Sequence, residues 1–119
     1  MLLTGMLMAF SSAPVFAENP QTLFKESKRL QDAGDSTAAI KILQQLVENY
    51  PELPEPYNNL AVIYAHQHEW DKARDALEMA IRTNPDYAAA YENLGDLYTH
   101  LAALAREKAK ALRHQQNKP

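Results

Sequence analysis

The chain has 119 residues and a formal net charge of −3 at pH 7, and it contains no cysteine. The length is that of one domain, and without cysteine there can be no disulfide framework, thiolate nucleophile or iron–sulfur site. Because the helix formers Ala, Leu, Glu, Gln and Lys dominate, we expect an all-α protein.

The start of the chain, over 1–17, has the pattern of a secretory signal. It is uncharged, with an apolar run over 2–10, and small residues, Val15 and Ala17, stand at the −3 and −1 places before Glu18. A membrane-spanning helix needs about 20 apolar residues, more than this stretch offers. The pattern predicts a signal peptide over 1–17, cleavage after Ala17 and export to a bacterial periplasm. The start lacks the usual Lys or Arg, and the alternative is an apolar tail on a cytosolic protein.

A spacing of 34 residues, the step from Pro51 to Pro85, repeats through the middle of the chain. A fixed period in this range is typical of stacked repeats, in which each helical unit buries its apolar face only against its neighbours. The spacing therefore predicts an α-solenoid of antiparallel helix pairs, which is a binding scaffold. The other pairs at this spacing are Ala39 and Ala73, Leu43 and Leu77, Leu46 and Ala80, Tyr57 and Tyr91, Leu60 and Leu94, Ala61 and Gly95, and Tyr64 and Tyr98.

The first copy is expected over about 20–53, as two helices joined by a turn. Asn19 can cap the first helix and Gly34 can end it. Asp35 or Ser36 can then start the second helix. On each helix three positions fall on one face at helical spacing: Leu23, Ser27 and Leu30 on the first helix, and Ala39, Leu43 and Leu46 on the second.

The second copy is expected over 54–87, again as two helices. Small residues such as Ala73 stand where two helix axes approach within about 8–10 Å. Trp70 is interpreted as lining the core over the helix pair. The inward positions are Tyr57, Leu60, Ala61 and Tyr64 on the first helix and Ala73, Leu77 and Ala80 on the second, and the tyrosines of the third copy, Tyr91 and Tyr98, are expected in the core likewise.

The third copy begins like the others and then departs from them, and two interpretations are open. In one, Tyr87 to about Leu112 forms a single long helix that covers the open end of the stack. In the other, a shortened turn lets Ala102, Arg106 and Ala109 act as a cramped second helix. An unbroken leucine stripe favours the single helix. Gly95 costs about 1 kcal/mol in a helix relative to Ala, so a close backbone contact is expected there.

This pattern resembles the tetratricopeptide repeat, a 34-residue pair of helices. The resemblance implies two repeat units plus a C-terminal capping helix: a domain over 18–112 with a partial third repeat over 88–112, followed by a polar tail over 113–119. The second copy matches the family's consensus positions nearly throughout, with Tyr57, Leu60, Ala61, Tyr64, Ala73, Leu77, Ala80 and Pro85.

The resemblance also implies a concave groove that binds a peptide or a partner helix, built mainly by the first helix of each repeat. Asn59 and Asn93 matter most, because an amide can both donate to and accept from a peptide backbone. The alternative is that an asparagine here only bonds a neighbouring turn. The groove positions carried over are Phe24, Lys28, Glu55, Asn58, Asn59, Val62, His66, Glu92, Asn93, Asp96 and His100.

Metal binding and catalysis find little support in the chain. His66, His68 and His100 could approach one another, but no carboxylate has ligand spacing, so we expect exposed groove histidines, no metal and no cofactor. There is no glycine-rich phosphate loop, no Gly-x-Ser-x-Gly and no His-Glu-x-x-His. The prediction is a protein that is not an enzyme.

The charges are unevenly spread. Residues 18–105 hold 7 basic and 14 acidic side chains, a net charge of −7, whereas residues 106–119 carry +4. An acidic scaffold is a poor partner for nucleic acid, whose binding is mostly cationic. The basic tail is interpreted as a solvated helix end, with at most weak peripheral contact to a membrane.

Together these patterns predict a non-catalytic protein–protein interaction adaptor of the cell envelope that binds a partner peptide or helix in its groove. The alternatives are an accessory domain of a larger envelope enzyme or assembly complex, and a nucleic-acid or membrane-surface binder acting through the basic tail. Because two repeats are near the minimum for a stable stack, a homodimer through the open face of the first copy is also an option.

Overall fold

The computed structural model describes residues 19–119, and the predicted signal peptide lies outside them. Within the described range the chain is entirely helical, without a strand, so the all-α prediction is confirmed. None of these helices is both long enough and apolar enough to cross a bilayer. The helices are α1 (Pro20–Asp32), α2 (Ser36–Asn49), α3 (Pro54–His66), α4 (Trp70–Thr83) and α5 (Ala88–Gln116).

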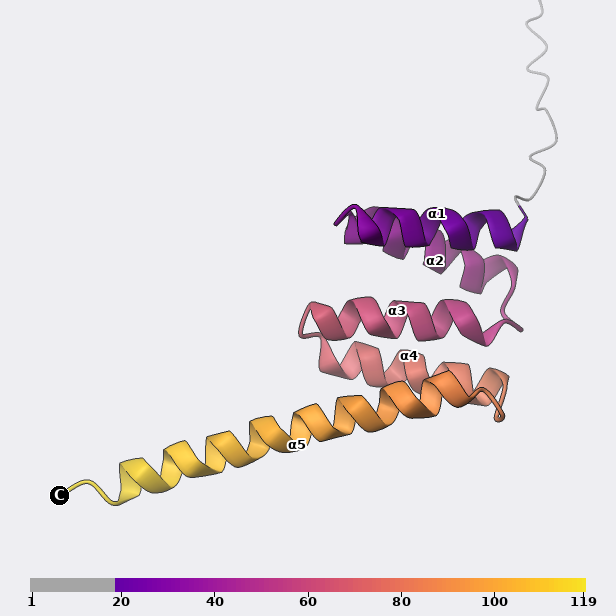
Figure 1. Ribbon diagram of the computed structural model, residues 1–119. Coiled ribbons are helices and arrows are strands. Elements are labelled where there is room, and N and C mark those ends of the chain that lie inside the picture. The colour runs from indigo at the N-terminus through magenta and orange to yellow at the C-terminus, as the bar shows by residue number, and fades with distance from the viewer. Residues whose placement is uncertain (1–18) are drawn as a thin grey trace, which may run out of the picture.

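The helices stack in pairs. Figure 1 shows α1 beside α2 and α3 beside α4, with the second pair lying under the first and α5 under α4. Helix α3 packs on both α2 and α4, and α5 packs mainly on α4 and to a smaller extent on α3. The expected α-solenoid of antiparallel helix pairs is confirmed.

Local capping sets the helix ends of the first repeat. The Asn19 Oδ1 atom accepts a hydrogen bond from the Gln21 amide at 2.8 Å, and Asp35 Oδ1 accepts from the Ala38 amide at 3.1 Å. Gly34 turns the chain between α1 and α2 with φ of 81°, in the left-handed region. In the second repeat the equivalent place is taken by His68, with φ of 60°. A side chain there costs roughly 1–2 kcal/mol relative to glycine.

Two apolar clusters form the core, and partly buried Tyr64 and Ala76 pack against both. Ser27 is buried, and its hydroxyl donates at 2.8 Å to the carbonyl of Phe24, a residue that packs against the first cluster. The buried members of the first cluster are Leu23, Ala39, Leu43, Leu46, Leu60 and Ile63. Those of the second are Ala61, Ala73, Leu77, Ala80, Ala90 and Leu97.

The segment after Tyr87 is the single long helix, and it continues through Gln116, so part of the expected polar tail is helical. Its N-terminal half buries Ala90 and Leu97 against the stack, while its C-terminal half projects beyond the stack (Figure 1). No described helix covers α5 on its outer side as α4 covers α3.

Two expectations about α5 are therefore wrong. Tyr91 and Tyr98 are 49% and 48% exposed instead of buried in the core. At Gly95 an added Cβ would meet nothing within 4 Å, so no close backbone contact accounts for this glycine. The physical reason is the same in both cases, because no described helix takes the place of the one that would pack on these residues in a complete repeat.

We predict that Ala73→Leu lowers the free energy of unfolding by about 1–3 kcal/mol, because Ala73 is a buried member of the second cluster, where a longer side chain would push α4 away from α3. Ala73 is only 1% exposed. Chemical denaturation measures the change. The matched control is Ala103→Leu on the exposed side of α5, which should leave the stability within about 0.5 kcal/mol. An unchanged unfolding midpoint for Ala73→Leu would contradict the packing.

Candidate functional site

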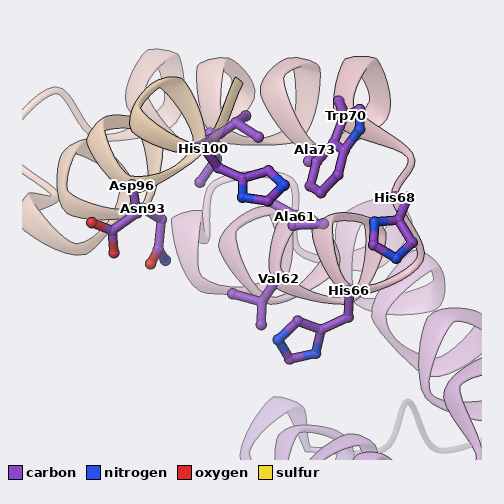
Figure 2. Close-up of a pocket in the computed structure, with 12 residues that line it drawn as sticks. Ala61, Val62, His66, His68, Trp70, Ala73, Asn93, Asp96 and His100 are labelled. Atoms are coloured by element: carbon purple, nitrogen blue, oxygen red, sulfur yellow. The ribbon is translucent and has the colours of Figure 1, made fainter. Parts of the chain in front are cut away.

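A cleft of about 450 Å³ opens between α3, α4 and α5. Its floor is apolar and comes from the core side of the second repeat, with Ala61, Ala73 and Leu77 buried beneath it. Figure 2 shows the polar and aromatic rim, which α3, α4, α5 and the turn between α3 and α4 supply together. The residues that line the cleft are Ala61, Val62, Ala65, His66, His68, Trp70, Ala73, Leu77, Asn93, Asp96, Leu97 and His100.

An aromatic group forms one wall of this cleft. The Trp70 ring stands edge-on to His68, with the ring centroids 5.2 Å apart, and lies tilted against His100 at 4.6 Å (Figure 2). Trp70 packs against the second core cluster, as its core-lining interpretation expected, and also faces the cleft. His68, which supplies one imidazole of this group, has a left-handed backbone conformation in the turn between α3 and α4.

A hydrogen bond between two asparagines joins α3 to α5 beside the cleft. The Asn93 Nδ2 atom donates to Asn58 Oδ1 at 2.8 Å, and Asn58 is only 6% exposed. Asn58 is therefore a packing residue between the helices, which does not fit its predicted place on the groove surface. Asn93 lines the cleft, and its amide bonds the side chain of Asn58 on a neighbouring helix instead of a neighbouring turn. Its contact with a partner peptide stays a prediction.

The predicted groove residues are divided between two cavities and positions that line neither. Val62, His66, Asn93, Asp96 and His100 line the cleft. A second cavity, of about 370 Å³, lies between the start of α1, the start of α3 and the residue before α5, and is lined by Phe24, Glu55 and Asn59 together with Pro20, Gln21, Leu53 and Tyr87. Asn59 and Asn93, expected to act together, thus line different cavities.

Besides the buried Asn58, two further predicted groove residues, Lys28 and Glu92, line neither cavity. Lys28 is exposed and forms an ion pair with Asp32 on its own helix, with Nζ 3.6 Å from Oδ2. Glu92 is exposed on α5.

The apolar floor of the cleft is not predicted from the sequence. Neither Ala65 nor Leu97 has a predicted role at a site, and Ala61, Ala73 and Leu77 are predicted as packing residues only. Alanines on successive turns of α3 were the available signal, because small side chains in facing helices can leave space as well as close it.

The two cavities differ in electrostatic character. Asp96 is the acidic side chain at the cleft, where three histidines share the rim. In the second cavity, burial and then the nearby negative charge of Glu55 raise the pKa of Tyr87, so its phenol keeps its proton further into the alkaline range than a free tyrosine does. Over residues 19–119, no group of three or more His, Asp or Glu side chains is arranged to hold a metal ion.

Comparison with known proteins shows which family the chain is similar to. Residues 30–97 match the family described as tetratricopeptide repeat. A tetratricopeptide repeat domain-containing protein, PYG7 of Arabidopsis thaliana chloroplasts, is 38% identical over 65 residues, which cover 51% of this chain and 22% of that protein.

Two further relatives are named photosystem I assembly protein Ycf3. The one from Prochlorococcus marinus is 26% identical over 102 residues, covering 82% of this chain and 59% of the relative. The one from a Synechococcus species is 25% identical over 87 residues, covering 71% and 50%. The chain therefore spans only part of these relatives, about half the length of the Ycf3 proteins.

We predict that Asn58→Ala and Asn93→Ala show a coupling free energy of about 0.5–1.5 kcal/mol in a double-mutant cycle of unfolding, because each change removes the same hydrogen bond. The control pair is Asn59→Ala with Asn93→Ala, which line different cavities and should be additive within about 0.5 kcal/mol. Additivity in both pairs would show that the asparagine bond does not hold α5 on α3.

Proposed function

Because the chain belongs to the tetratricopeptide repeat family, we propose that it is a non-catalytic adaptor that holds a peptide or helix of a partner protein in the cleft between α3 and α5. Domains of this family bind protein partners, and its members are generally adaptors and assembly factors without catalytic activity.

The observation that carries the proposal is the form of the cleft. Its volume falls within the range of about 300–1,000 Å³ that ligand pockets usually have. Alanine and leucine side chains supply an apolar floor that an aliphatic or aromatic side chain of the partner can fill. Asp96, Asn93 and the rim histidines supply polar groups that can fix the orientation of the partner's backbone.

The names of the relatives support an assembly role. Two of them are called assembly proteins of photosystem I, and the alignment with the Prochlorococcus protein covers most of this chain. We propose that this chain likewise binds one component of a protein complex while the complex forms. The acidic side chain at the rim, together with the net charge of −7 over residues 18–105, favours a component whose bound segment carries positive charge.

The proposed place of action is the bacterial cell envelope, on the periplasmic side. The support is the N-terminal pattern of an uncharged apolar run followed by small residues before Glu18.

We predict that Val62→Glu reduces recovery of the partner at least about tenfold, which corresponds to about 1.4 kcal/mol of binding free energy. Val62 is half-buried beside the apolar floor, and a carboxylate there would be desolvated by the partner's aliphatic or aromatic side chain that fills the floor, which carries no counter-charge. The measurement is capture from the envelope fraction by the tagged full chain, followed by quantitative mass spectrometry.

Two controls make this test specific. Gln44→Glu introduces the same charge on the exposed side of α2 and should recover the partner as the unchanged chain does. Since the chain has a single tryptophan and it lines the cleft, addition of the purified partner should also shift the fluorescence of Trp70. Equal recovery by Val62→Glu and the unchanged chain, without a fluorescence shift, would rule out the cleft as the binding site.

We predict further that the protein isolated from its cells begins at Glu18, because a signal peptidase would cleave after Ala17. Mass spectrometry of the N-terminus measures this directly. An Ala17→Lys variant should retain the uncleaved N-terminus, while a protein that keeps residues 1–17 without this change would disprove export by this route.

A further inference from the structure

One side of α5 carries large apolar residues that no described helix covers. Tyr91, Tyr98 and Leu112 are 49%, 48% and 43% exposed. They are spaced by whole heptads, so they lie along one face of the helix. The small residues Gly95, Ala102, Ala105 and Ala109 fall on the same stripe, which we call the outer stripe of α5.

The second repeat shows what such a face normally contacts. Tyr57, Ala61 and Tyr64 of α3 stand one repeat before Tyr91, Gly95 and Tyr98 of α5. On α3 these side chains pack in the same cluster as Ala73, Leu77 and Ala80 of α4. The outer stripe therefore has the chemistry of an inter-helix contact whose second helix is missing from the described part of the chain.

The projecting half of α5 has the features of that second helix. On α4 the covering residues follow one another at intervals of four and three, as Ala73, Leu77 and Ala80. The same intervals separate Ala105, Ala109 and Leu112 in the part of α5 that extends beyond the stack. Of these, Ala105 and Leu112 are exposed and Ala109 is half-exposed.

We propose that a second copy of this chain covers the outer stripe, with the two α5 helices antiparallel. In this pairing the projecting half of each copy acts as the second helix of the other copy's third repeat. Tyr98 of each copy then faces Ala105 of the other, and Tyr91 of each copy faces Leu112 of the other. Each contact therefore occurs twice, as two-fold symmetry requires. The small residues of the stripe allow the two helix axes to approach closely.

Charge complementarity favours a second copy of α5 on the outer stripe, and it favours the antiparallel direction over the parallel one. Over residues 88–105, α5 contains Glu92 and Asp96 and no Lys or Arg. Over 106–119 the chain carries +4. Antiparallel pairing sets the acidic half of each helix beside the basic half of the other, whereas parallel pairing would set like charges together. Glu92 and Arg113 each follow a stripe residue by one position, so they lie on the same flank and meet across the antiparallel pair.

This interface is different from the binding cleft and from the open face of the first repeat. Asn93, Asp96 and His100, which line the cleft in Figure 2, fall outside the heptad positions of the outer stripe. The cleft therefore stays open in the dimer, and the inference does not depend on the proposed adaptor function.

The test is the oligomeric state of the full chain, measured by light scattering coupled to size-exclusion chromatography and by sedimentation equilibrium. The expected result is a mass of twice 13.4 kDa for the unchanged chain and of one chain for Ala105→Glu. Ala105 is exposed and contacts no core cluster, so the change should leave the circular dichroism of the monomer intact. The matched control is Ala103→Glu, which lies on the opposite side of the same helix and should remain dimeric.

The direction of the pairing is tested by disulfide formation, since the chain has no cysteine of its own. Ala102→Cys lies close to the expected two-fold axis and should form a homodisulfide on oxidation. Tyr91→Cys alone should not, but it should cross-link when mixed with Leu112→Cys. A monomeric chain at submillimolar concentration, a dimer that persists in Ala105→Glu, or self-cross-linking of Tyr91→Cys would each overturn the proposal.

Discussion

The structure depends on the close approach of α3 and α4, which small residues on both helices make possible. Ala61, Ala73 and Ala80 are each at most 2% exposed and belong to one cluster. Because no long side chain separates the two backbones, Tyr57 and Tyr64 can fill the space beside them. A larger residue at the centre of this contact would move α4, and the position of α5 depends on α4.

The position of α5 leaves a cleft on one side of this helix and an uncovered apolar stripe on another. It lies against α4 and α3 as the first helix of a third repeat would, and this placement leaves the cleft whose floor is the exposed edge of the second repeat's core. The same helix continues straight through Gln116 without turning back, which leaves its outer stripe uncovered. A binding cleft and a face suited to a second copy therefore have one structural cause.

Two residues at or beside the cleft depart from local stability rules. His68 adopts a left-handed backbone conformation at the place where the first repeat has Gly34, and its ring contacts Trp70. Asn58 places a polar amide in a buried contact and has its Oδ1 atom satisfied by Asn93. Natural proteins tolerate such departures mainly where function or specificity benefits. Their concentration around one cleft is consistent with its proposed role.

The helices, their caps and the pairing of neighbours could be predicted from the sequence, because they follow from local spacing and from contacts between adjacent elements. Asn19, Gly34 and Asp35 act where predicted, and the choice of a single final helix followed from the unbroken leucine stripe. Only the tertiary structure decided which groove positions meet. The burial of Asn58, the separation of Asn59 from Asn93 and the exposure of Tyr91 and Tyr98 depend on which helix lies opposite each residue. A repeat pattern specifies the face that a residue occupies, but packing between helices distant in the sequence determines whether that face is covered.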